Sequence, residues 1–140
     1  MGVLEDLDAR MDTLEVYAIL AAERQLELSM RLLPELAGAS ISVTVYTNYR
    51  GDDELHRAKH REQRFTVRGL GNPIEHAQLR AYPMGYGSVD GDAMWSIEGP
   101  GHRQTSCPTS ELLSTIANHV REHAEECAAR APSAGVAGVS

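Results

Sequence analysis

Four of the six histidines form two pairs at i, i+4, a spacing that places two imidazoles on one face of a helix. The pairs are His56 with His60 and His119 with His123, and the second series continues to Cys127. Imidazole and thiolate are ligands of zinc, so His119 and His123 are candidate metal ligands and zinc is the candidate cofactor. Residues i to i+8 span about 12 Å along a helix, so all three groups of the second series cannot meet one ion. In the competing interpretation, His119 and His123 lie at the edge of an apolar helix face and keep a ring nitrogen in water.

The thiol of Cys107 is a second candidate for chemistry, because it stands directly before an expected C-terminal helix. The positive end of a helix dipole stabilises a thiolate, so this position can lower the pKa of the thiol. His102 lies close enough in the chain to activate Cys107, but no cysteine-hydrolase signature surrounds either residue. The glycine-rich stretch 82–87 lacks the ending of a phosphate loop and opens no helix. We therefore assign no catalytic residue and favour a binding protein over an enzyme.

A cluster of cations stands out in an acidic chain, in which 13 Lys and Arg oppose 20 Asp and Glu for a net charge of −7. Its members are candidates for gripping a phosphate or an acidic ligand: Arg57, Lys59, Arg61, Arg64 and Arg68. Strand periodicity puts Arg64 and Arg68 on one face and Phe65 on the other, so the cluster lacks the stacking rings of a single-strand nucleic-acid site. The acidic balance also argues against a nucleic-acid partner. In the competing interpretation, these cations only pair with the surplus acids on a solvated strand face.

Aromatic side chains are scarce, since Phe, Trp and Tyr make up 5% of the chain. Aromatic residues contribute a large share of the binding energy at protein interfaces. We therefore expect five of them to anchor a partner protein: Tyr46, Tyr49, Tyr82, Tyr86 and Trp95. The last three fall in a glycine-rich hairpin, which makes that hairpin the first place to look for a binding surface.

These candidates need elements to position them, and the first element is a long helix over 4–36. Strong helix formers fill it, Pro34 should kink its last turn, and Gly38 suits its C-cap. Along this helix runs a seam of residues spaced alternately three and four apart: Leu4, Leu7, Met11, Leu14, Ala18, Ala21, Gln25, Leu28 and Leu32. This heptad pattern predicts a homodimer through helix 4–36, but a helix lying across a sheet within one chain would show a similar stripe.

After Gly38 the apolar period changes from 3.6 to 2, which is typical of strands. Asp90-Gly91 matches the preference of a two-residue hairpin turn. Four strands are expected, over about 40–49, 64–68, 77–84 and 93–97, with a long polar loop of at most a helical turn or two between the first pair. The predicted fold class is α+β, with a long N-terminal helix, a four-stranded antiparallel meander sheet, and a C-terminal helix packed on the same sheet face.

Residues 1–130 are expected to form a single domain, whose last helix runs from about Pro108 to Arg130. The small uncharged residues of 131–140 predict a flexible tail. No apolar run reaches the roughly 18 residues that a membrane helix requires, and early acids replace the basic start of a secretory signal. Two cysteines are too few for a disulfide framework, so we expect a cytoplasmic protein without membrane contact.

Together these features predict a small acidic cytoplasmic protein that binds another protein, of inhibitor, adaptor or chaperone type. It would act by occluding its partner's surface, as a homodimer and without a cofactor. One alternative is a sensor of a small ligand, nucleotide or phosphate that uses the cations of 57–68 beside the glycine-rich hairpin. Another is a metal-dependent enzyme built on His119 and His123.

Overall fold

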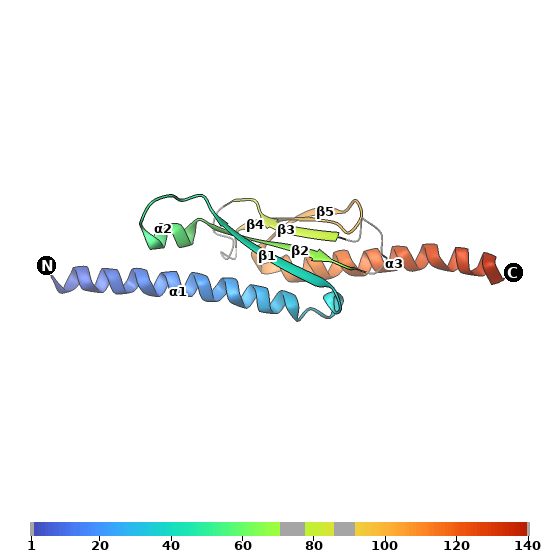
Figure 1. The fold of residues 1–140 in the computed structure, drawn as a ribbon, viewed down its shortest axis with the longest axis horizontal. Helices are drawn as coiled ribbons and strands as arrows, with labels where there is room; N and C mark the ends of the chain where they lie inside the picture. The colour runs from blue at the N-terminus through green and yellow to red at the C-terminus, as the bar shows by residue number, and fades with distance from the viewer. Residues whose placement is uncertain (1, 71–77, 86–91, 140) are drawn as a thin grey trace.

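The computed structural model describes residues 2–70, 78–85 and 92–139 (Figure 1). The chain changes from helix to strand at the point where the apolar period of the sequence changes. The long helix α1 (Val3–Arg31) comes first, followed by a 3₁₀ turn (Pro34–Leu36) in which proline occupies a position that needs no N–H donor. Gly38 then has a φ of +82°, a left-handed conformation that glycine adopts without strain. The expected break at Pro34 and Gly38 is therefore where helix ends and sheet begins.

The sheet contains five strands in the order β1-β2-β3-β4-β5, each antiparallel to its neighbours. They are β1 (Ser40–Thr47), β2 (Arg61–Arg68), β3 (Gln78–Pro83), β4 (Met94–Glu98) and β5 (Gln104–Pro108). The α+β class and the antiparallel meander are confirmed, but the expected number of four strands is wrong. The apolar pattern of the sequence does not reveal the edge strand β5. Cys107 is its single buried residue, so apolar and polar residues do not alternate along it.

Two further helices complete the fold. The short helix α2 (Glu54–Lys59) lies in the expected polar loop, and the Asp53 carboxylate caps it by accepting from the backbone N–H of Leu55 at 2.9 Å. The C-terminal helix α3 (Leu112–Val139) begins after a 3₁₀ turn (Thr109–Glu111), because Pro108 ends β5 instead of opening the helix. It extends to Val139. Within the described ranges, no helix combines the length and the apolar character needed to cross a bilayer.

Both long helices pack on one face of the sheet, and the core lies between them and that face (Figure 1). The strands contribute Phe65, Val67, Leu79, Ala81, Trp95, Ile97 and Cys107. The helical segments contribute Met30, Leu36, Leu112, Ile116 and Val120. Each large side chain buried in this way stabilises the fold by roughly 1.5–3 kcal/mol. No described helix covers the opposite face of the sheet, on which Arg64, Arg68 and Arg80 are exposed.

Candidate binding surface

Alternation along the strands gives the sheet a polar face opposite the one that the helices cover. On β2, Phe65 and Val67 are buried, whereas Arg64 and Arg68 on either side of them are exposed. The strand register brings the polar residues of β1, β3 and β4 beside those of β2. We call this surface the open face; its exposed and half-buried residues are Ser42, Thr44, Tyr46, Glu62, Arg64, Thr66, Arg68, Gln78, Arg80, Tyr82 and Glu98. Ser96 of β4 shares this face and is buried.

Arg64 lies at the centre of the open face, between two tyrosines. Its guanidinium carbon is 4.8 Å from the ring centroid of Tyr46 and 5.9 Å from that of Tyr82, both within the range of a cation–π contact. Its Nη2 also donates to the Glu62 carboxylate at 3.0 Å. A shallow hollow of about 290 Å³ lies over this group, with Thr44, Thr66 and Arg80 among its other lining residues. The centre of the open face therefore presents rings and hydroxyls around a cation that is already paired.

A second group on the open face joins β3 and β4. The Glu98 carboxylate accepts from the Tyr82 hydroxyl at 2.7 Å and from Nη2 of Arg80 at 3.0 Å. These two donors, the Tyr82 hydroxyl first, stabilise the carboxylate and lower the pKa of Glu98 below its ordinary value. Tyr82 thus contacts both groups, and its ring and hydroxyl are held in one orientation.

The aromatic residues expected to anchor a partner divide between two places in the described structure. Tyr46 and Tyr82 lie on the open face. Tyr49 lies beyond the end of β1, where its ring stacks on His56 and His60 with centroid separations of 5.6 and 5.9 Å. His56 of α2 and His60 at its C-terminal end therefore form a stack of rings with Tyr49.

Trp95 belongs to the core. Its side chain is fully buried on the covered face, its ring stacks on Phe65 at 5.9 Å between centroids, and its indole N–H donates to Oγ1 of Thr109 at 2.8 Å. A partner cannot reach this ring, which corrects the expectation that Trp95 anchors one. Tyr86 and the Asp90-Gly91 turn lie outside the described residues.

The cations of 57–68 also point in different directions. Arg61 lies on the covered side of β2, where its guanidinium binds both oxygens of Glu23 on α1 at 2.8–3.0 Å. The backbone carbonyl of Glu23 in turn accepts from Nε2 of Gln63 at 3.0 Å. The Glu23 side chain is 7% exposed and that of Arg61 30% exposed, so this pair fastens α1 to the sheet.

The remaining cations of the cluster lie on α2 and on the open face. Arg57 donates to the backbone carbonyl of Gly51 at 2.7 Å, and Lys59 lies 3.7 Å from the Glu15 carboxylate. Of the five, Arg64 and Arg68 share the open face. Arg80 joins them from β3, and sequence reasoning missed it because it lies outside the cluster in the chain; the alternation of 78–83 was the available signal.

His119 and His123 occupy different environments on α3. His119 is buried, donates from Nδ1 to the carbonyl of Gly99 at 2.8 Å, and has Nε2 2.8 Å from Oγ1 of Thr105. Both ring nitrogens are therefore engaged by the protein. Gly99 has a φ of +87°, and a Cβ there would stand 2.2 Å from the carbonyl oxygen of Gln78, so the bond to His119 depends on glycine at this position. In the part of the chain that the structure describes, no three His, Cys, Asp or Glu side chains gather around a possible metal position.

Cys107 is also buried, on the covered face of β5. Burial raises the pKa of its thiol above the ordinary value, because the charged thiolate loses its hydration. The expectation that a helix dipole lowers this pKa is wrong, since Cys107 precedes a strand end and a 3₁₀ turn, and α3 begins only at Leu112.

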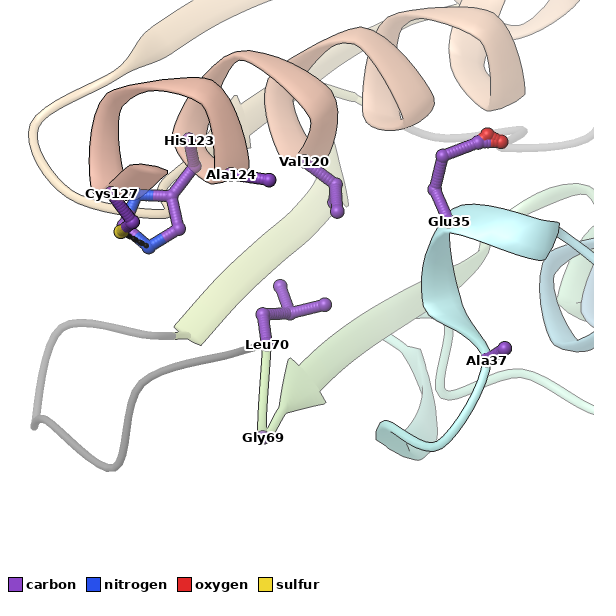
Figure 2. A pocket seen from close by; sticks show the side chains of 8 residues that line it. All are labelled: Glu35, Ala37, Gly69, Leu70, Val120, His123, Ala124 and Cys127. Atoms are coloured by element: carbon purple, nitrogen blue, oxygen red, sulfur yellow. Dashed lines mark hydrogen bonds between the residues drawn. The ribbon is translucent and has the colours of Figure 1, made fainter. Parts of the chain in front are cut away.

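A cleft of about 360 Å³ lies between α3, the 3₁₀ turn and the end of β2 (Figure 2). It is lined by Glu35, Ala37, Gly69, Leu70, Val120, His123, Ala124 and Cys127. Figure 2 shows the imidazole of His123 against the thiol of Cys127, with Sγ and Nε2 3.5 Å apart. Leu70 and Val120 supply apolar walls, and the polar groups of the cleft are the pair of His123 with Cys127 and the carboxylate of Glu35.

Comparison with models of protein families, with curated proteins and with solved structures finds no match to this chain.

Proposed function

We propose that this protein binds another protein through the open face of its sheet and acts by occluding the surface that it binds, as an inhibitor, adaptor or chaperone. The observation that carries the proposal is Arg64 between Tyr46 and Tyr82 at the centre of a sheet face that no described helix covers. Tyrosine and arginine are the residue types, with tryptophan, that dominate the binding energy of protein interfaces. Rings with fixed orientation also lose little conformational entropy on binding.

The charges of the open face favour a protein surface over a free phosphate. Arg64 and Arg80 each already pair with a glutamate, so a phosphate would have to displace Glu62 or Glu98. A protein surface can instead pack on the two tyrosine rings and add hydrogen bonds around the existing pairs. With Arg68, the described open face carries three arginines against two glutamates, and it fits a partner patch that is neutral or mildly acidic.

We further propose that the protein works in the cytoplasm and as a homodimer through α1. Cys107 and Cys127 are both free thiols, which suits a reducing compartment. The heptad seam of α1 lies on the surface of the single chain, with Leu4 76% and Leu14 67% exposed, and a second chain would cover it.

The binding proposal is tested by quantitative co-purification from the native host with matched variants. Arg64→Ala and Tyr82→Ala remove the centre of the open face, and Arg121→Ala, at an exposed site on α3, serves as the control. A partner that binds the open face is depleted by both test variants, retained by the control, and cross-linked to β2 or β3 when the complex is rebuilt from purified components. Unchanged recovery of every captured protein contradicts the proposal.

The phosphate-sensor alternative has its own readout. Inorganic phosphate and nucleotides are added to the purified protein, and its melting temperature is measured. The proposal expects no specific stabilisation. A rise in melting temperature that Arg64→Ala abolishes and Arg121→Ala retains would favour the alternative.

A further inference from the structure

The seam of α1 is an apolar stripe on the outside of the chain. All nine of its residues are exposed: Leu4, Leu7, Met11, Leu14, Ala18, Ala21, Gln25, Leu28 and Leu32. It covers four heptads, or about 42 Å of helix at 1.5 Å per residue. Single exposed leucines are ordinary on protein surfaces, but a continuous stripe of this length marks an interaction site.

Within the described residues, the core of the chain lies on the side of α1 opposite this stripe. Glu23 and Met30 are buried, and Leu26 and Leu33 are half-buried against the core. A helix advances 100° per residue, so Met30 lies about 200° around the axis from Leu28. One side of α1 therefore packs against the sheet of the same chain, and the seam lies on the side that faces away from that sheet.

We infer that this seam pairs with the seam of a second copy of the chain, as a parallel and in-register two-stranded coiled coil. The inference rests on the homodimer proposed above and adds its direction and register. The alternation of three and four residues is the pattern by which two helices interlock their side chains. Ala18 and Ala21 in the middle of the seam allow the two backbones to approach closely.

The charges beside the seam select the parallel direction. With Leu4 and Met11 at a positions, the charged g residues are Arg10, Arg24 and Arg31 and the charged e residues are Asp8 and Glu15. The other g positions hold Val3 and Tyr17, and the other e positions hold Ala22 and Ser29. In a parallel pair, each g residue faces the e residue of the next heptad on the other chain, which sets Arg10 against Glu15 of the second copy. In an antiparallel pair, g faces g, so Arg10 meets Arg24 or Arg31 of the second copy and like charges repel.

Gln25 selects the register. It is the polar residue of the seam, and in a parallel in-register pair it faces Gln25 of the second copy, so that each amide can hydrogen-bond the other. An antiparallel pair sets it against Leu7 or Leu14, where a polar amide faces an apolar side chain. A single polar residue at an a position is a known determinant of register, because misaligned pairs leave it without a partner.

The parallel arrangement also places the two binding surfaces together. In Figure 1, the sheet lies over the C-terminal half of α1, and α2 lies over its middle. Two parallel helices therefore carry both sheets at the same end of the rod, on opposite outer sides. One dimer would present two open faces to a partner with two equivalent sites.

The first test measures mass in solution, by light scattering at tens of micromolar. The wild-type chain should have twice the chain mass of 15.3 kDa, and Leu14→Glu should have the chain mass with an unchanged circular dichroism spectrum. Leu14 is 67% exposed in the single chain, so the substitution removes the pairing surface without opening the core. A monomeric wild-type protein, or a dimer that Leu14→Glu leaves intact, overturns the inference. The co-purification with Arg64→Ala is independent of this result, so the two proposals fail separately.

The second test measures direction, by oxidising single cysteines in a Cys127→Ser background. Leu7→Cys and Leu28→Cys, at d positions, should each form a disulfide-linked dimer, because equal residues meet in a parallel pair. Ala9→Cys, on the outer side of α1, is the control and should stay monomeric under denaturing conditions. In an antiparallel pair, equal residues at either end lie roughly 20 Å or more apart, so absence of both disulfides overturns the inference.

The third test is a charge reversal whose sign depends on direction. In the parallel pair, Arg10→Glu should weaken the dimer about tenfold in dissociation constant. The variant Arg10→Glu/Glu15→Arg should restore it when Lys59→Glu is added, because Lys59 pairs with residue 15 of its own chain. In an antiparallel pair, Arg10→Glu would relieve repulsion and strengthen the dimer, which overturns the inference. Sedimentation equilibrium at low salt measures both constants.

Discussion

Arg61 and Arg64 stand on the same strand but on opposite faces of the sheet, and they show how the two faces differ. Arg61 binds both oxygens of a buried glutamate on α1 and so helps to hold a helix on the covered face. Arg64 pairs with Glu62 on its own strand and lies between two partly accessible tyrosines. The charge on the covered face contributes to the fold, whereas the charge on the open face orients groups that a partner can contact.

The aromatic residues show the same division. Phe65 and Trp95 stack on each other in the core, and Tyr46 and Tyr82 flank Arg64 on the other side of the same strands. A tyrosine hydroxyl is satisfied at the surface, while the apolar ring of Phe65 requires burial. If this comparison is correct, substitutions on the covered face should change stability, and those on the open face should change binding.

The comparison is tested most strongly by Trp95→Ala against Tyr82→Ala. Trp95→Ala should lower the free energy of unfolding by about 3–5 kcal/mol, because it empties a large site in a packed core. Tyr82→Ala should lower it by about 1 kcal/mol or less, since its neighbours can be hydrated. Urea unfolding followed by circular dichroism measures both. Equal losses would mean that Tyr82 is a core residue and that the open face is not a free surface.

The two ion pairs on β2 provide the next largest difference. Glu23→Ala should cost about 1–3 kcal/mol of unfolding free energy, because it leaves Arg61 partly buried without this carboxylate. Glu62→Ala should cost about 0.5 kcal/mol or less, because Arg64 stays accessible to water. The same unfolding experiment compares them. A larger cost for Glu62→Ala would reverse the roles assigned to the two faces.

Local patterns in the sequence predict most of the helices and strands. The break at Pro34 and Gly38 and the alternation of Phe65 and Val67 follow from the preferences of single residues and from the period of the apolar pattern. The alternation of apolar and polar residues along a strand also predicts which residues share a face of the sheet, but it does not predict which face the helices cover. For that reason Trp95 was expected at a binding surface, whereas it lies under the helices with Phe65.

The rest depends on contacts between segments that are distant in the chain. The pair of Arg61 with Glu23 and the group of Arg80 with Glu98 each join separate elements, and the strand register that aligns them has no local signal. The edge strand β5 was missed because it contains a single buried side chain, Cys107, among polar residues and a proline. Site residues on a sheet are therefore harder to predict than the strands that carry them.

A smaller effect distinguishes the faces through pH. Burial raises the pKa of Cys107 on the covered face, so its contribution to stability is fully present below the ordinary thiol pKa of about 8.5 and is lost as the pH rises from there towards the raised value. The free energy of unfolding should therefore fall between pH 7 and pH 9.5, and Cys107→Ala should reduce that fall. Cys127→Ala, beside the cleft, is the matched control. An equal pH dependence in wild type and Cys107→Ala would show that the buried thiol makes no such contribution.

The smallest expected effect is a pKa on the open face. The Tyr82 hydroxyl and Arg80 lower the pKa of Glu98, so the stabilisation they provide is present above the ordinary glutamate pKa and is lost as the pH falls through the lowered value. Tyr82→Phe removes the leading cause and should raise this pKa towards the ordinary value, with the ring still beside Arg64. Tyr46→Phe, which removes a hydroxyl from the other ring beside Arg64, is the control. Carbon-13 NMR titration of the Glu98 carboxylate measures both. A pKa that Tyr82→Phe leaves unchanged would mean that Tyr82 is not held by Glu98, and that a partner would meet a ring without a fixed orientation.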